Sequence, residues 1–200
     1  MKNKYLKWKI VKAKAEIYIE SNTELYSYYQ TMSPAVLSHA EGVTKIALIL
    51  GISKGLSDKE LLTLGIAGLL HDIGKIFISS LILYKDGNLT DEEFEVIKEH
   101  SKTGAILIKR LGVEDQIVEL VMNHHEKIDG SGYPNGLKDD EINQLTKILT
   151  IADIWDALRH KRCYKEALSG NEAIENLRST KGLDKELVND FVKLVHKLRL

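Results

Sequence analysis

The sequence predicts an all-α fold, a compact bundle of several helices in a chain of 200 residues. Helix start signals recur along the chain, and the apolar residues between them repeat at the spacing of one helical face. No alternating apolar pattern of useful length predicts a strand, and there is no internal repeat. With 44% hydrophobic residues, the chain is long enough to bury one core of ordinary size.

Composition narrows the function classes. The chain has 28 basic and 29 acidic residues and a formal net charge of −1, which gives no overall attraction to a nucleic acid polymer. Its single cysteine, Cys163, excludes an intramolecular disulfide and a thiolate metal cluster. No apolar run of about eighteen residues predicts a membrane span, and the lysine-rich start lacks the features of a secretory signal. We therefore expect a cytoplasmic protein that contacts no membrane.

Residues 1–32 predict an N-terminal extension that is helical at least in part. Six lysines precede the first acidic residue, Glu16, and the apolar residues among them fit a helical face only loosely. We prefer a helix that packs on the main body through Trp8 and Ile10, and a basic arm that contacts an anionic surface is the alternative. Residues 21–32 have no clear period and predict a connection.

The next two helices lead to the first candidate site residues. Ser33 and Pro34 predict a helix start, with Ser33 as the N-cap, and Gly51 is expected to end that helix. A capping box that begins at Ser57 opens the second helix, which leads into His71.

Another capping box begins at Thr90 and opens a helix whose apolar residues, Phe94 among them, lead to His100. A turn at residues 84–88 precedes it. Two further short helices are expected at 105–111 and 117–125, and the second carries His124 and His125 on an apolar stripe.

The remainder of the chain predicts one long loop and three helices. The loop covers residues 126–140, and the most apolar helix, 145–158, contains Asp153 and Asp156. A third capping box begins at Ser169. An amphipathic helix that reaches Leu198 completes the bundle.

Histidines and aspartates recur at the apolar faces of these helices. They are His39, His71, Asp72, His100, His124, His125 and Asp153. Each alone has a plain structural explanation, such as a salt bridge or a cation at a helix end. Together they place many polar groups where an unpaired one is costly. Because imidazole and carboxylate suit divalent iron, manganese, zinc or nickel, and because the set exceeds the needs of one ion, the sequence predicts two divalent metal ions.

Other polar residues follow these histidines and have two interpretations each. Lys75 lies one helical turn beyond His71 and could neutralise charge on a phosphoryl oxygen, or it could be an exposed lysine. Residues 129–134 form a glycine-rich approach with one aromatic ring, or an ordinary connection. Arg162, Tyr164 and Lys165 suit a phosphate and a base, or form a solvated helix end.

Four motifs, in order, resemble the HD-GYP family of the HD phosphohydrolases. They are His71–Lys75, His124–Lys127, Asp129–Pro134 and Ala152–Leu158. The resemblance extends from about His39 to the last helix, so we interpret residues 33–200 as the HD-GYP-like domain. It implies a helical domain with two or three metal ions, often iron or manganese, that hydrolyses cyclic di-GMP to linear pGpG or to GMP. Some relatives prefer cyclic GMP-AMP.

Residue by residue, the resemblance implies a ligand set for each ion. One ion would be bound by His39, His71, Asp72 and Asp153, and the other by Asp72, His100, His124 and His125. Asp72 would bridge the two ions, and Lys75 would be the catalytic lysine. Arg162 and Lys165 would hold the substrate phosphates. The loop of Gly132, Tyr133 and Pro134 would lie beside the pocket and is a candidate contact for a regulatory protein.

Several positions depart from the family pattern. Ala35 stands where members with a third metal carry a glutamate, so two metals are expected. Gly42 replaces a common arginine, and Phe77 and Arg159 also depart from the pattern, as does Cys163; such changes are expected to alter the fit of the substrate. Two other functions stay open: hydrolysis of another nucleotide or phosphate ester on the same metal centre, and a catalytically weak module that binds a cyclic dinucleotide in regulation.

Overall fold

The computed structural model describes residues 2–159 and 167–199, with side chains from residue 6 onward. The helices are α1 (Lys2–Ser21), α2 (Thr23–Gln30), α3 (Pro34–Lys54), α4 (Asp58–Leu70), α5 (Ser80–Leu83), α6 (Asp91–Arg110), α7 (Asp115–Asn123), α8 (Gln144–Arg159), α9 (Gly170–Ser179) and α10 (Lys185–Leu198), with short 3₁₀ helices η1 (Ile73–Phe77) and η2 (Asp139–Glu141). The described ranges contain no strand, only an isolated bridge between Asp129 and Lys138. The predicted all-α bundle is confirmed.

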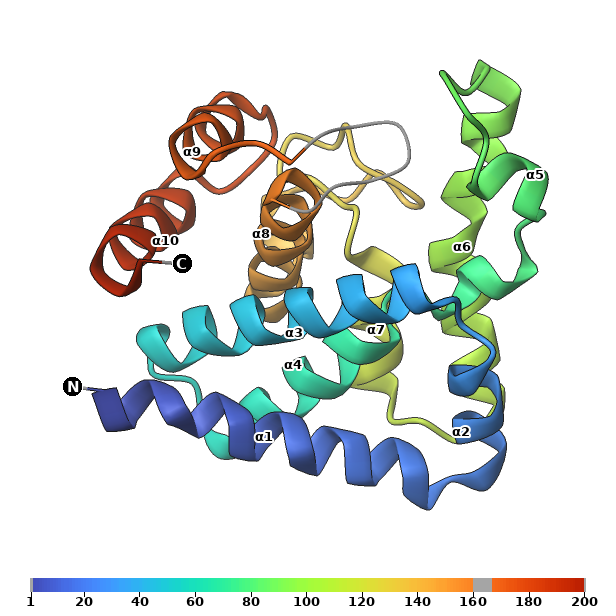
Figure 1. Ribbon diagram of the computed structural model, residues 1–200, viewed down its shortest axis with the longest axis horizontal. Helices are drawn as coiled ribbons and strands as arrows, with labels where there is room; N and C mark the ends of the chain where they lie inside the picture. The colour runs from blue at the N-terminus through green and yellow to red at the C-terminus, as the bar shows by residue number, and fades with distance from the viewer. Residues whose placement is uncertain (1, 160–166, 200) are drawn as a thin grey trace.

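Helix α3 lies in the middle of the bundle, between α1 and α4 on one side and α8 on the other (Figure 1). Ser33 caps its start and Pro34 occupies the first turn, as predicted. Gly51 does not end the helix, so that prediction was wrong; the end comes at Gly55, which has a φ of 80°. Gly51 stays helical and small because a Cβ there would lie 2.9 Å from Leu56 Cδ1.

The composition of α3 follows from this central position. An eighteen-residue stretch of the helix has a mean hydropathy of 1.4, enough by length and composition to cross a membrane. However, 56% of that stretch is buried inside the bundle. Contact with α1, α4 and α8 therefore accounts for its apolar residues, as in the core helix of a soluble domain.

The N-terminal segment differs from its prediction in two details. Helix α1 is helical and Trp8 packs on the core, as expected, but Ile10 is 62% exposed, and the buried apolar residues of α1 are Val11, Ala15 and Ile19. Residues 21–32 are not a simple connection, because they contain α2, whose start is capped by the Asn22 side chain at 3.1 Å from the Leu25 amide. The boundary at residue 32 stays a prediction.

Helix α6 is one continuous helix rather than the two that the sequence predicted. The two predicted helices were separated near Gly104. The structure shows that close packing, and not a helix end, requires a glycine at this position. A Cβ on Gly104 would lie 2.9 Å from the Gly74 amide nitrogen, and one on Gly74 would lie 2.0 Å from the His100 carbonyl oxygen. These glycines let η1, which follows His71, pack directly on α6.

The three predicted capping boxes are present. In each, the hydroxyl accepts a bond from the amide of the glutamate three residues later, and that glutamate accepts a bond from the cap amide. They fix the starts of α4, α6 and α9. Two of these helices carry site residues, since α4 ends at His71 and α6 contains His100.

Candidate metal centre

Three buried histidines have their ring orientation fixed by the main chain. His71 and His124 are the C-cap residues of α4 and α7, where the last carbonyl groups of a helix lack intrahelical partners. In each histidine, Nδ1 lies close to the carbonyl oxygen three residues earlier. The distances are 2.8 Å to Gly68 for His71, 2.6 Å to Ile97 for His100 and 2.8 Å to Val121 for His124. Since a carbonyl only accepts hydrogen bonds, Nδ1 donates and the Nε2 of the neutral ring carries a lone pair.

The Nε2 lone pairs of these three histidines converge. His100 Nε2 lies 3.3 Å from His124 Nε2 and 3.2 Å from His125 Nε2. His71 Nε2 is buried and has no hydrogen-bond partner. Because the acceptor nitrogens of His100 and His124 cannot bond to each other, and the lone pair of His71 has no donor, the arrangement is unfavourable unless a cation lies among them. The chemistry of the donor set therefore fits divalent metal ions.

Protonation of the histidines does not replace the cation that these nitrogens need. Burial lowers the pKa of His100 and, further, that of His124. Burial also lowers the pKa of His125 to about 3. The three rings are therefore neutral at pH 7, which is the form that binds metal.

Asp72 lies between two groups of these ligand atoms. Its Oδ1 is 3.3 Å from His100 Nε2, while its Oδ2 is 3.4 Å from His71 Nε2 and 2.6 Å from Lys75 Nζ. Burial alone would raise the pKa of Asp72, but the Lys75 ammonium and the neighbouring imidazoles hold it well below its usual value. The carboxylate is thus ionised, with one oxygen toward each group.

The remaining predicted ligands come from α3, α7 and α8. His39 Nε2 lies 2.9 Å from Asp153 Oδ1, and His125 Nδ1 lies 3.7 Å from Asp153 Oδ2. Compact sets of ligand atoms, all within 4.8 Å of one another, are formed by His39 with His71 and Asp153, by His100 with His124 and His125, and by His71 with Asp72 and His124. The structure therefore brings all seven predicted ligands together in one cluster.

Asp156 is a site residue to which the sequence assigned no role. It is buried on α8, and its Oδ2 accepts a hydrogen bond from His39 Nδ1 at 2.7 Å. Burial tends to lower the pKa of His39, but its bonds to Asp153 and Asp156 prevail and raise it to about 9. The sequence did contain a signal for this role of Asp156. It follows Asp153 by three residues, and this spacing places the two carboxylates on one helical face.

Gly42 makes room for Asp156. A Cβ on Gly42 would lie 2.0 Å from Asp156 Oδ1, closer than any real contact. Gly42 does not line the pocket described next, and its effect on the fit of the substrate stays a prediction. Because Gly42 has no side chain, the Asp156 carboxylate has the space in which it accepts the hydrogen bond from His39.

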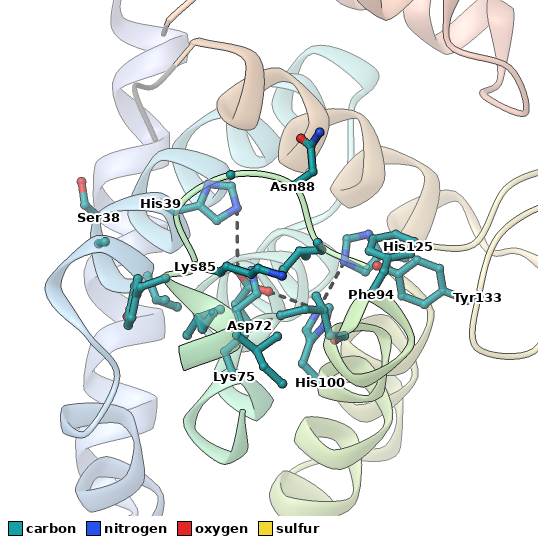
Figure 2. Close-up of a pocket in the computed structure, with 18 residues that line it drawn as sticks. Ser38, His39, Asp72, Lys75, Lys85, Asn88, Phe94, His100, His125 and Tyr133 are labelled. Atoms are coloured by element: carbon teal, nitrogen blue, oxygen red, sulfur yellow. Dashed lines mark hydrogen bonds and ion pairs between the residues drawn. The ribbon is translucent and has the colours of Figure 1, made fainter. Parts of the chain in front are cut away.

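A pocket of about 600 Å³ opens onto the cluster (Figure 2). His39, Asp72, His100 and His125 point toward one another at its floor. Lys75, Ala35 and Tyr133 also line it, whereas Phe77 and Arg159 do not. Arg162, Cys163, Tyr164 and Lys165 lie outside the described residues.

The loop of Gly132, Tyr133 and Pro134 reaches the pocket through its tyrosine alone. The Tyr133 ring lies 4.6 Å from the His125 ring, centroid to centroid. Gly132 packs on the chain instead, since a Cβ there would lie 2.4 Å from the Lys127 amide nitrogen. Pro134 is exposed and follows a cis peptide bond.

Glu126 holds this loop and was also missed by sequence reasoning. It is 2% exposed, and its carboxylate accepts hydrogen bonds from the amides of Asn135 at 2.6 Å and Leu137 at 3.0 Å. These bonds close the loop on which Tyr133 is carried. The only sequence signal was an acidic residue directly after the histidine pair.

Known proteins resemble the chain in sequence and in fold. Residues 23–187 match the HD domain family. A cyclic di-GMP phosphodiesterase of Pseudomonas aeruginosa is 36% identical over 78% of this chain and 38% of its own length. A 3′3′-cGAMP-specific phosphodiesterase of Vibrio cholerae is 36% identical over 74% of this chain and 33% of its own length. The chain thus spans less than half of these curated relatives.

A solved structure gives the fold comparison. An HDG"Y"P protein from Bdellovibrio bacteriovorus superimposes with a TM-score of 0.70 at 20% identity, over 96% of this chain and 64% of that one.

Proposed function

The chain belongs to the HD domain family, as a member of its HD-GYP branch, and we propose that it is a metal-dependent phosphodiesterase that hydrolyses a cyclic dinucleotide. Cyclic di-GMP is the substrate that we favour, with linear pGpG or GMP as the product. The observation that carries the proposal is a pocket that opens onto converging imidazole nitrogens around an ionised aspartate. Its volume falls in the range of small-molecule sites.

The ligand set supports two ions. His39, His71, Asp72 and Asp153 would hold one, and Asp72, His100, His124 and His125 the other. When bound, such ions supply Lewis-acid activation of a phosphoryl oxygen and of water. Iron and manganese are the metals that we favour, because the resemblance to the HD-GYP family implies them; the nitrogen and oxygen ligands alone also suit zinc or nickel.

Lys75 and Asp72 have separate roles in this proposal. The Lys75 ammonium is fixed at 2.6 Å from Asp72 Oδ2 and lines the pocket, so it can stabilise negative charge that develops on a phosphoryl oxygen. Asp72 orients that ammonium with one oxygen while both its oxygens face the histidine nitrogens. The fixed geometry means that no reorganisation is needed during reaction.

Substrate and partner contacts complete the proposal. Tyr133 would contact the substrate from the pocket wall, with Gly132 and Pro134 shaping its loop, and Arg162 and Lys165 would hold phosphates. The exposed side of the loop at Pro134 is available to a regulatory protein. We expect a cytoplasmic protein that contacts neither a membrane nor a nucleic acid polymer.

The test is Asp72→Ala, with exposed Asp140→Ala as the control. Asp72→Ala should lose bound metal and the hydrolysis of cyclic di-GMP, because the position shared by both sites is removed. Metal content is measured by elemental analysis and turnover by chromatography. Retained metal with undiminished turnover in Asp72→Ala would contradict the proposal.

A substrate panel separates the proposal from its alternatives. Cyclic di-GMP, 3′3′-cGAMP, mononucleotides and simple phosphate esters are incubated with protein loaded with iron(II) or manganese(II). If only the mononucleotides or esters are hydrolysed, the protein is a phosphohydrolase of another substrate class that uses the same metal centre. Equilibrium binding of cyclic di-GMP with no product after long incubation would indicate a binding module instead.

A further inference from the structure

Phe94 is an aromatic residue that faces the pocket instead of the core. It lies in the first turn of α6, and its side chain is 45% exposed and lines the pocket. A ring that is partly exposed inside a pocket offers apolar surface that a ligand can cover.

Lys98 joins the Phe94 ring to Tyr133. The Lys98 Nζ lies 5.0 Å from the centroid of the Phe94 ring and 5.7 Å from that of the Tyr133 ring. Glu95 fixes the ammonium with a 2.6 Å ion pair. Lys98 itself does not line the pocket, whereas both rings do. The cation therefore holds α6 and the tyrosine loop together from outside the pocket and leaves ring surface toward it.

Phe94 and Tyr133 differ in what else touches them. Tyr133 also packs on the His125 ring, so its ring is occupied on the side of the cluster. No aromatic ring of residues 6–159 or 167–199 packs on Phe94. Figure 2 shows Phe94, Tyr133 and His125 on the side of the pocket away from His39. Phe94 is thus the aromatic surface left for a ligand at this wall.

The distance from the cluster suits a base rather than a phosphate. Phe94 precedes His100 by six residues of one helix, about 9 Å along the axis at 1.5 Å per residue. The first turn of α6 holds three acidic residues, and Glu93 pairs with Lys85 at 2.6 Å. The Phe94 ring offers a phosphate neither charge nor a hydrogen-bond donor, whereas it can stack on the face of an uncharged base.

We propose that Phe94 is a specificity-determining residue that stacks on a nucleobase of the cyclic dinucleotide while a phosphate of that ligand lies at the cluster. The inference rests on the proposed function. Stacking of a base on an aromatic ring is sequence-tolerant, so Phe94 favours nucleotides as a class and does not select guanine over adenine.

The test compares Phe94→Leu with Val96→Ala. Val96 lies on the same helix, is 42% exposed and does not line the pocket, so it is a matched control. Phe94→Leu should raise the KM for cyclic di-GMP about tenfold, within the range expected for one stacked base, with a smaller change in kcat. Phe94→Trp should restore the wild-type KM, and Val96→Ala should change neither constant.

A binding measurement tests base stacking on Phe94 without relying on turnover. A cyclic dinucleotide that carries 2-aminopurine in place of one guanine should lose fluorescence on binding to the wild-type protein, because the base stacks, and lose less on binding to Phe94→Leu. Equal affinity and equal quenching in Phe94→Leu and Val96→Ala would overturn the inference. A wild-type protein that binds and quenches the probe but hydrolyses no cyclic dinucleotide would overturn the proposed function and leave Phe94 supported.

Discussion

The histidines of the cluster are held in two different ways. His71, His100 and His124 donate from Nδ1 to main-chain carbonyl oxygens of their own helices. His39, on α3, donates to a side chain of another helix, the carboxylate of Asp156. The first kind of bond is present wherever the helix forms. The second depends on a separate residue and on the space that Gly42 leaves for it.

This difference shows which parts of the cluster substitutions can adjust and which they would abolish. A main-chain carbonyl cannot be removed by substitution, so the three rings keep their orientation as long as their helices fold. The His39 side of the cluster relies on a partner outside the ligand set, an arrangement known to tune metal sites. Substitutions near His39 should therefore adjust the site, whereas substitutions of the other three histidines should abolish it.

The largest effect is expected from His124→Ala. This variant removes a buried ligand nitrogen and leaves His100 and His125 with one fewer partner. Turnover should fall by more than about 100-fold, beyond the loss usual for an outer partner of a ligand. Bound metal should fall in parallel, as measured by elemental analysis. The control is His196→Ala, an exposed position on α10; equal metal content in the two variants would contradict the prediction.

Asp156→Ala should have an intermediate effect. Without the carboxylate, His39 loses the group that fixes its Nδ1 proton, and metal affinity or turnover should fall about 10- to 100-fold. Asp156→Asn should recover part of the loss, because an amide oxygen still accepts a bond from Nδ1. Titration with manganese(II) measures the affinity. If both variants bind metal as the wild type does, Asp156 does not position His39.

Gly42→Ala tests the same contact through space. Its methyl group would meet Asp156 Oδ1, so the carboxylate must move and the metal affinity should fall by up to about tenfold. Gly65→Ala is the matched control, since its Cβ would meet only ordinary contacts at 3.5 Å. The double variant Gly42→Ala/Asp156→Ala should be no worse than Asp156→Ala alone. Additive losses would show that Gly42 acts elsewhere.

The smallest effect is expected at the start of α4, far from the site. Ser57→Ala removes the N-cap and should lower the free energy of unfolding by about 1 kcal/mol, while Ser57→Gly should lower it by only a few tenths. Because His71 is held at the other end of the helix, neither variant should change metal content. Urea denaturation measures the stability. Loss of metal in folded Ser57→Ala would contradict the independence of the main-chain bond.

The sequence predicted the helices with strong local signals and the residues that share their apolar faces. Capping boxes at Ser57, Thr90 and Ser169 act within four residues, so they can be read without tertiary information. The aspartates and histidines of the cluster were found because polar groups on apolar faces need partners. The family resemblance then supplied their grouping.

What the sequence did not predict depends on contacts between distant segments. Gly51 was predicted to end a helix, yet it lies inside α3, and Gly104 lies inside α6 between two segments that were predicted as separate helices; in both cases another element packs against the glycine. Gly42 and Asp156 are 114 residues apart in the chain, and the need for a glycine at one position is explained only by its contact with the carboxylate at the other. The sequence likewise did not show that Phe94 faces the pocket, since an apolar stripe cannot show which of its members faces a cavity.

The most direct test of the metal centre is the metal content of the protein purified without oxygen, measured together with cyclic di-GMP hydrolysis before and after chelation. We predict two divalent ions per chain, loss of turnover when they are removed, and recovery on addition of iron(II) or manganese(II). Full turnover by protein that contains no metal would contradict the central claim that these seven residues form a metal-binding catalytic site.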